Sequence, residues 1–113
     1  MNAQAEAHVQ TTVLVLKRVL VVDDDASILG VVSEVLEDDG YEVTTAGSAE
    51  EAIEKLKDNK FALVMSDFRL PGINGIGLLK HIKEVSPRTA VIIITSHGSM
   101  QTSIEAIKLG AYD

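Results

Sequence analysis

The sequence predicts an α/β fold, a doubly wound parallel sheet with helices on both faces. One observation is that short apolar runs alternate with stretches in which apolar residues recur at helical spacing. The other is that capping residues or glycines stand at several of the boundaries between these segments. Strands that alternate with helices in this way pair in parallel through right-handed crossovers.

The first strand is expected at residues 19–22, a continuous apolar run of the kind found in strands buried on both faces. A helix follows, with Asp25 as the expected N-cap and Gly40 as the residue that ends it. One face of this helix is marked by apolar residues at i, i+3, i+4 and i+7, namely Ile28, Val31, Val32 and Val35.

A capping box predicts the start of the second helix, with Ser48 as the N-cap and the Glu51 side chain reaching back toward the N-cap backbone. Its buried face is expected to carry Ala49, Ala52, Ile53 and Leu56. The remaining expected elements are strands at 41–46, 61–65 and 90–94, a glycine-rich helix at 75–85, and a last helix from about 99 to 110.

Composition sets the class of the protein. The 113 residues suffice for one domain, and 46% of them are apolar, as in globular proteins. The net charge of −7 disfavours direct binding of nucleic acid or of an anionic membrane surface. The absence of cysteine excludes disulfides and thiolate zinc sites.

The first 16 residues are expected to form a leader that is disordered in part, and residues 17–113 to form the domain. The leader does not resemble a signal peptide, and the apolar stretch at 13–22 is interrupted by charges and too short to span a bilayer. A cytoplasmic protein is therefore expected.

Polar residues follow three of the expected strands directly. In an open parallel sheet, ligands bind beyond the carboxyl ends of the strands, where the strand order reverses. The residues placed at that edge are Asp23, Asp24, Asp25, Ser66, Asp67, Thr95 and Ser96.

Clustered carboxylates must either hold protons or hold a cation. No histidine or cysteine accompanies Asp23, Asp24 and Asp67, so an oxygen-only site suited to Mg²⁺, Mn²⁺ or Ca²⁺ is predicted. A carboxylate can also be the nucleophile in phosphoryl transfer, and a hydroxyl such as that of Thr95 can donate to a phosphoryl oxygen. Helix capping by Asp25 and a turn at Asp67 are simpler readings of single residues, but capping needs only one acid.

Four stretches of the sequence resemble the CheY-like receiver domains of bacterial response regulators, and most of all those of the NtrC type. The resemblance covers about residues 17–113 and implies a flavodoxin-like sheet of strand order 2-1-3-4-5. The stretches that carry it are 19–25, 63–75, 91–96 and 104–113.

The resemblance implies a role for each site residue. Asp67 would be the phosphoacceptor, and Mg²⁺, with Mn²⁺ as a substitute, would be held by Asp24, Asp67 and the backbone carbonyl of Arg69. Asp23 would hold the metal through a water molecule.

Further roles are implied by the same family. Thr95 would be the switch hydroxyl in contact with the phosphoryl group, with Ser96 beside it. Arg69 and His97 would tune the lifetime of the phosphoryl group. The implied partners are a sensor histidine kinase and a downstream output module that would act in transcription, and a homodimer is a further expectation. The domain would not be an enzyme beyond its own phosphorylation and dephosphorylation.

The sequence departs from the family in one respect. The family's Lys-Pro pair and switching aromatic would lie beyond Asp113, so the fifth strand and fifth helix are expected to be missing from this chain. Such a chain would be a piece of a longer protein, or would complete its sheet by swapping or dimerising.

Two other functions remain open at this point. One is a haloacid-dehalogenase-like phosphatase, because Asp23 and Asp25 have that family's D-x-D spacing and Asp23 would be its nucleophile. The other is a dimerisation module that works without phosphorylation. Labelling by acetyl phosphate in Mg²⁺ would distinguish all three, since it would fall on Asp67, transiently on Asp23, or on neither.

Overall fold

The computed structural model describes residues 16–94 and 111–112, and its strands form one parallel sheet. The sheet has the order β2-β1-β3-β4-β5. This order confirms the expected α/β class and places the reversal of strand order between β1 and β3. The strands are β1 (Arg18–Val22), β2 (Glu42–Ala46), β3 (Leu63–Asp67), β4 (Ala90–Ile94) and β5 (Ala111–Tyr112).

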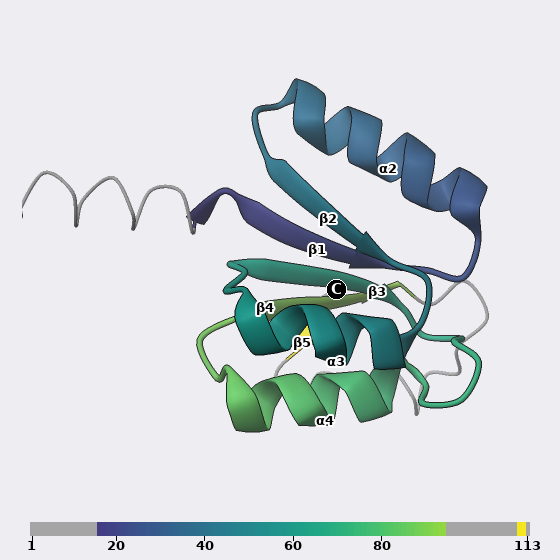
Figure 1. Cartoon of the computed structure of the whole chain (residues 1–113), viewed down its shortest axis with the longest axis vertical. Helices are drawn as coiled ribbons and strands as arrows, with labels where there is room; N and C mark the ends of the chain where they lie inside the picture. The colour runs from purple at the N-terminus through teal and green to yellow at the C-terminus, as the bar shows by residue number, and fades with distance from the viewer. Residues whose placement is uncertain (1–15, 95–110, 113) are drawn as a thin grey trace, which may run out of the picture.

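Helices cover both faces of the sheet. Figure 1 shows α2 (Ala26–Asp38) on one side and α3 (Ala49–Asp58) together with α4 (Gly75–Val85) on the other. Within the described ranges, no helix is long and apolar enough to cross a membrane.

The main core lies between the sheet and the pair α3 and α4. Alternate strand residues point into it, among them Leu20 and Val22 of β1 and Val64 of β3, all almost fully buried. The helices contribute Ala49, Ala52, Leu78, Leu79 and Ile82. Val19 and Val21 of β1 are also buried, on the other face, as expected for a central strand.

The two residues predicted to begin and end the first helix, Asp25 and Gly40, are confirmed in these roles at the ends of α2. The carboxylate of Asp25 accepts hydrogen bonds from the backbone N–H groups of Ser27 and Ile28, at 2.9 and 3.4 Å. At the other end, Gly40 has a φ of 91°, which a side chain would disfavour. The N–H of Gly40 donates to Glu37 and that of Tyr41 to Leu36, so a Schellman motif ends the helix.

The capping box of α3 differs in one detail from the expected one. Ser48 Oγ accepts from the N–H of Glu51 at 3.1 Å, as predicted. The Glu51 carboxylate reaches back to the N–H of Gly47, at 2.8 Å, one residue before the N-cap.

The bounds of three expected strands need correction, and the smallest change is that β1 begins at Arg18 instead of residue 19. The third strand was expected at 61–65 but occupies Leu63–Asp67, because Phe61 is buried as a core side chain without pairing in the ladder. Ser66 and Asp67 are therefore the last residues of β3 and do not follow it. The second strand begins at Glu42, since the N–H of Tyr41 belongs to the motif that ends α2.

The expectation of a missing fifth strand is also corrected in part. Ala111 and Tyr112 pair in parallel with Val91 and Ile92 of β4, so this strand begins within the chain. A run of two residues after Gly110 is too short for a sequence pattern to indicate. The leader and the last expected helix, from about 99 to 110, lie outside the described residues and stay predictions.

The apolar stripe noticed on the first helix is mostly exposed. Ile28, Val31 and Val35 are 45%, 64% and 58% exposed. The half-buried apolar residues of α2, which packs on β1 and β2, are Leu29, Val32 and Leu36, so Val32 is the one member of the predicted stripe that is not exposed. Because the apolar residues of this helix are spread over a wide arc, periodicity alone could not decide which part of the arc faces the sheet.

Candidate functional site

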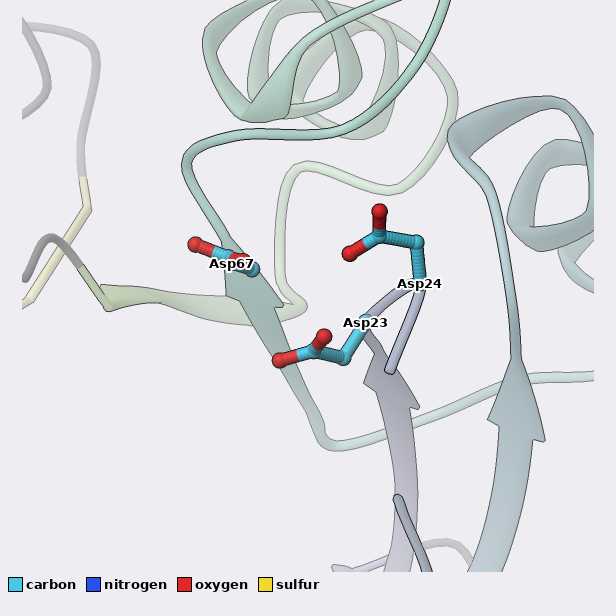
Figure 2. A group of neighbouring side chains, drawn as sticks. All are labelled: Asp23, Asp24 and Asp67. Atoms are coloured by element: carbon cyan, nitrogen blue, oxygen red, sulfur yellow. The ribbon is translucent and has the colours of Figure 1, made fainter. Parts of the chain in front are cut away.

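The structure brings three aspartates together at the carboxyl edge of the sheet. Asp23 and Asp24 come directly after β1, and Asp67 is the last residue of β3. One carboxylate oxygen from each lies within 4.8 Å of the others. Figure 2 shows the three side chains around the adjacent tips of β1 and β3. The clustering expected from the strand ends is therefore present.

Backbone hydrogen bonds orient two of these carboxylates. Asp23 Oδ1 accepts from the N–H of Asp25 at 2.9 Å, and Asp67 Oδ1 accepts from the N–H of Arg69 at 3.2 Å. Each bond spans two residues, the geometry by which aspartate stabilises a turn. The turn reading of Asp67 is thus correct, and it leaves lone pairs on the carboxylate for a second ligand.

The tips of the two strands are themselves held in place. The N–H of Asp23 donates to the carbonyl of Ala46 at 3.1 Å, and the N–H of Phe68 donates to that of Ile94 at 3.0 Å. Ser66 is fully buried, and its hydroxyl donates to the carbonyl of Asp67 at 2.9 Å. These bonds fix the backbone from which Asp23 and Asp67 project.

The charges in the cluster oppose one another. Two full charges 4.8 Å apart repel by roughly 3.5 kcal/mol at an effective dielectric of about 20. The pKa of Asp23 is raised, mainly by its burial and also by the charges of Asp67, Asp24 and Asp25, while the hydrogen bond from the Asp25 N–H lowers it. A divalent cation would relieve this repulsion.

The ligand atoms suit a hard cation. All three side chains offer carboxylate oxygens, and Asp23 is buried, Asp67 half-buried and Asp24 exposed. An oxygen-only set with one open side fits Mg²⁺, which keeps several waters, better than Zn²⁺. The cluster could therefore hold a metal ion, and the predicted ligands Asp23, Asp24 and Asp67 are its members.

Asp25 does not belong to the cluster. Its side chain caps α2 and is exposed, although the D-x-D spacing made it a partner of Asp23 in the phosphatase interpretation. The acid that joins Asp23 and Asp24 is Asp67, which that interpretation left without a role.

The other predicted site residues divide into two groups. Arg69 lies directly after the cluster in the loop that follows β3, and its side chain is exposed. Thr95, Ser96 and His97 follow β4 and lie outside the described residues, so their roles stay predictions.

Two residues that the sequence analysis did not single out contact the site's backbone. Gly75, the first residue of α4, donates its N–H to the carbonyl of Phe68 at 2.9 Å, and a Cβ there would lie 2.7 Å from the carbonyl oxygen of Asp67. Glu50 Oε1 accepts from the N–H of Ile73 at 3.1 Å. Gly75 stands in a motif that the resemblance included, whereas nothing local in the sequence indicates the bond from Glu50.

A large open groove, about 1010 Å³, lies at the opposite edge of the sheet, before the strands begin. Lys57, Phe61, Val85 and Arg88 line it, with Asp58 as its one carboxylate. It offers no cluster of acids, so the chemistry places the site at the carboxyl edge.

Neutralising Asp23 should stabilise the metal-free protein. Because the folded-state pKa of Asp23 is raised, ionisation favours unfolding, and the stability that the protonated form contributes is lost as pH rises through that pKa. Asp23→Asn should therefore unfold a few degrees higher than wild type at neutral pH in EDTA, roughly 1 kcal/mol. The difference should vanish as pH falls toward the ordinary value of 3.8.

Thermal unfolding across pH, with and without Mg²⁺, measures this effect. Adding Mg²⁺ should raise the Tm of wild type more than that of Asp23→Asn. A variant less stable than wild type at neutral pH in EDTA would contradict the electrostatic account.

Comparisons with known proteins found a matching family and several similar proteins. The response regulator receiver domain family matches residues 19–113. The transcriptional regulatory protein ZraR of Escherichia coli K12 is 40% identical over 95 residues, which are 84% of this chain and 22% of ZraR. The nitrogen assimilation regulatory protein NtrX of Azorhizobium caulinodans is 39% identical over 97 residues, 84% of this chain and 21% of NtrX. The chain thus spans about a fifth of the length of these relatives.

Solved structures share the fold. The beryllofluoride-activated NtrC4 receiver domain dimer, known from a solution structure, has a TM-score of 0.82 and 45% identity, covering 87% of this chain and 81% of that one. A CheY-like receiver domain protein from Methanospirillum hungatei JF-1 has a TM-score of 0.81 and 36% identity, covering 85% and 77%.

Proposed function

Because this chain belongs to the family of response regulator receiver domains of two-component systems, we propose that it accepts a phosphoryl group on Asp67 from a sensor histidine kinase. The observation that carries the proposal is the meeting of carboxylate oxygens from Asp23, Asp24 and Asp67 within 4.8 Å. A receiver domain is a signalling domain, and its own chemistry here would be limited to gaining and losing that group.

The same cluster would bind Mg²⁺, or Mn²⁺ in its place. Asp24, Asp67 and the backbone carbonyl of Arg69 would be direct ligands, and Asp23 would act through a water molecule. When bound, the cation would offset negative charge on the phosphoryl oxygens. The oxygen-only donor set and the raised pKa of Asp23 both support this assignment.

Asp67 would act as the nucleophile. One of its carboxylate oxygens forms a bond to phosphorus while the bond from phosphorus to the donor's leaving group breaks, and the leaving group keeps the electron pair. The hydrogen bond from the Arg69 N–H to Oδ1 holds the carboxylate in one orientation during this step. Ser66 and Phe68 fix the adjacent backbone.

Thr95 and Ser96 would contact the phosphoryl group, and Arg69 and His97 would adjust its lifetime. Contact from a hydroxyl after β4 would draw that loop toward the site and change the surface around the last helix. Moving such a two-state domain from 1:99 to 99:1 takes about 5.5 kcal/mol of differential interaction. Charge-assisted hydrogen bonds to a phosphoryl group, with repacking, are of that order.

The partners follow from the relatives. ZraR and NtrX are named as regulatory proteins several times longer than this chain, which supports a downstream output module that controls transcription. The NtrC4 receiver is described as a dimer when activated, which supports a homodimer here. We place the protein in the cytoplasm, with no direct contact to nucleic acid or membrane by this domain.

The test is labelling with acetyl phosphate in the presence of Mg²⁺, followed by mapping of the modified residue. A label on Asp67 that EDTA prevents is the expected result. A transient label on Asp23 would instead indicate a phosphatase, and no label under any divalent condition would indicate a module that works without phosphorylation.

A further inference from the structure

A single hydrogen bond links the start of α3 to the loop that follows β3. Glu50, in the first turn of α3, accepts through Oε1 from the backbone N–H of Ile73 at 3.1 Å. The two residues are 23 positions apart in the sequence. The loop from residue 68 to 74 also contains Arg69, the proposed source of a backbone ligand.

This loop is held at both of its ends by other bonds. Near β3, the N–H of Arg69 donates to Asp67 Oδ1 at 3.2 Å. Near α4, the N–H of Gly75 donates to the carbonyl of Phe68 at 2.9 Å, which closes the loop on itself. Leu70 anchors the middle of the loop in the core, and Glu50 adds a hydrogen bond to the part that follows, at Ile73.

The fit between Glu50 and the loop is close. Gly72 has a φ of 73°, a left-handed conformation that favours glycine. A Cβ built at Gly72 would lie 2.7 Å from Glu50 Oε1, so a side chain there would displace this carboxylate from the turn.

Stabilisation of the helix N-terminus does not by itself account for the hydrogen bond between Glu50 and Ile73. Glu51 in the same turn already bonds the N–H of Gly47, and Ser48 already caps the helix. Glu50 instead turns across to another segment of the chain. Its pKa is lowered, first by the hydrogen bond from Ile73 and then by its own backbone N–H, which keeps the acceptor ionised.

We propose that Glu50 is a positioning residue for the metal site, which fixes the loop that presents the Arg69 carbonyl beside Asp67. Glu50 is not itself a member of the carboxylate cluster. The inference rests on the proposed function, because it assigns Glu50 to the same Mg²⁺ site. Outer residues that orient metal ligands commonly change metal affinity when they are replaced.

Two substitutions at Glu50 and one control test this role in the whole chain. Glu50→Ala removes the acceptor, whereas Glu50→Gln keeps a carbonyl oxygen that can accept from Ile73 and removes the charge. Glu54→Ala is the matched control, since Glu54 is an exposed acid of the same helix that pairs with Lys57. Mg²⁺ affinity is measured by titration, and hydrogen exchange of the Ile73 amide by NMR.

Glu50→Ala should weaken Mg²⁺ binding about tenfold and speed exchange of the Ile73 amide. Glu50→Gln should remain within about twofold of wild type in both, and Glu54→Ala should match wild type. The Gly77 amide donates a hydrogen bond to Asn74 Oδ1 at 3.0 Å, at the start of α4. Its exchange should stay unchanged in all variants, which would show that α4 is intact.

Equal affinities for Glu50→Ala and Glu54→Ala would overturn the inference. So would a Glu50→Gln variant as weak as Glu50→Ala, since the charge and not the bond would then be responsible. A wild-type protein that fails to bind Mg²⁺ or to be labelled on Asp67 would instead refute the proposed function itself.

Discussion

Asp67→Asn should abolish formation of the acyl phosphate. The amide has no carboxylate oxygen to attack phosphorus, yet it keeps the size of the side chain and an Oδ1 that can accept from the Arg69 N–H. The loss should be at least about a hundredfold, because removal of a nucleophile is rarely compensated. Intact-protein mass after incubation with acetyl phosphate and Mg²⁺ measures it.

Asp58→Asn provides the matched control. Asp58 is an exposed aspartate at the end of α3, beside the groove at the opposite edge of the sheet. This variant should be labelled like wild type. A mass increase of one phosphoryl group on Asp67→Asn would show that the acceptor has been assigned to the wrong residue.

Gly75→Ala should damage both stability and the site. A Cβ at this position would lie 2.7 Å from the carbonyl oxygen of Asp67 and 2.9 Å from the Cα of Phe68. Both are backbone atoms, so the end of β3 or the start of α4 must shift. Overpacking of this kind costs about 1–3 kcal/mol, and the shift should also weaken Mg²⁺ binding, because it moves Asp67.

Gly30→Ala is the control for this change. Gly30 lies within α2, and a Cβ there would meet nothing within 4 Å. Alanine should stabilise the helix by about 0.5–1 kcal/mol, so the two glycine substitutions should move the urea midpoint in opposite directions. A Gly75→Ala variant as stable as wild type would mean that the contact between α4 and the end of β3 is not as tight as described.

Much of the fold could be predicted because its signals are local. The apolar runs of the central strands, the cap at Asp25 and the glycine that ends α2 each depend on a few neighbouring residues. The carboxylate cluster was also predictable, since acids that directly follow or end parallel strands must meet at one edge of the sheet.

The parts that could not be predicted depend on packing between distant segments. The hydrophobicity of Phe61 indicated a strand, although its side chain fills the core from a position before β3. The apolar residues of α2 span a wide arc of the helix, and only packing decides that Val32 is half-buried while Ile28, Val31 and Val35 are exposed. The bond from Glu50 to Ile73 joins segments whose proximity arises only when α3 and the loop after β3 are in place.

Paramagnetic broadening by Mn²⁺ tests the central claim most directly. Substoichiometric Mn²⁺ should broaden the backbone amide signals of residues 23–25 and 67–69 first, and an excess of Mg²⁺ should restore them. Broadening centred on the acidic end of α2, at Glu37 and Asp38, or signals near Asp67 that stay sharp, would contradict a metal site formed by the tips of β1 and β3.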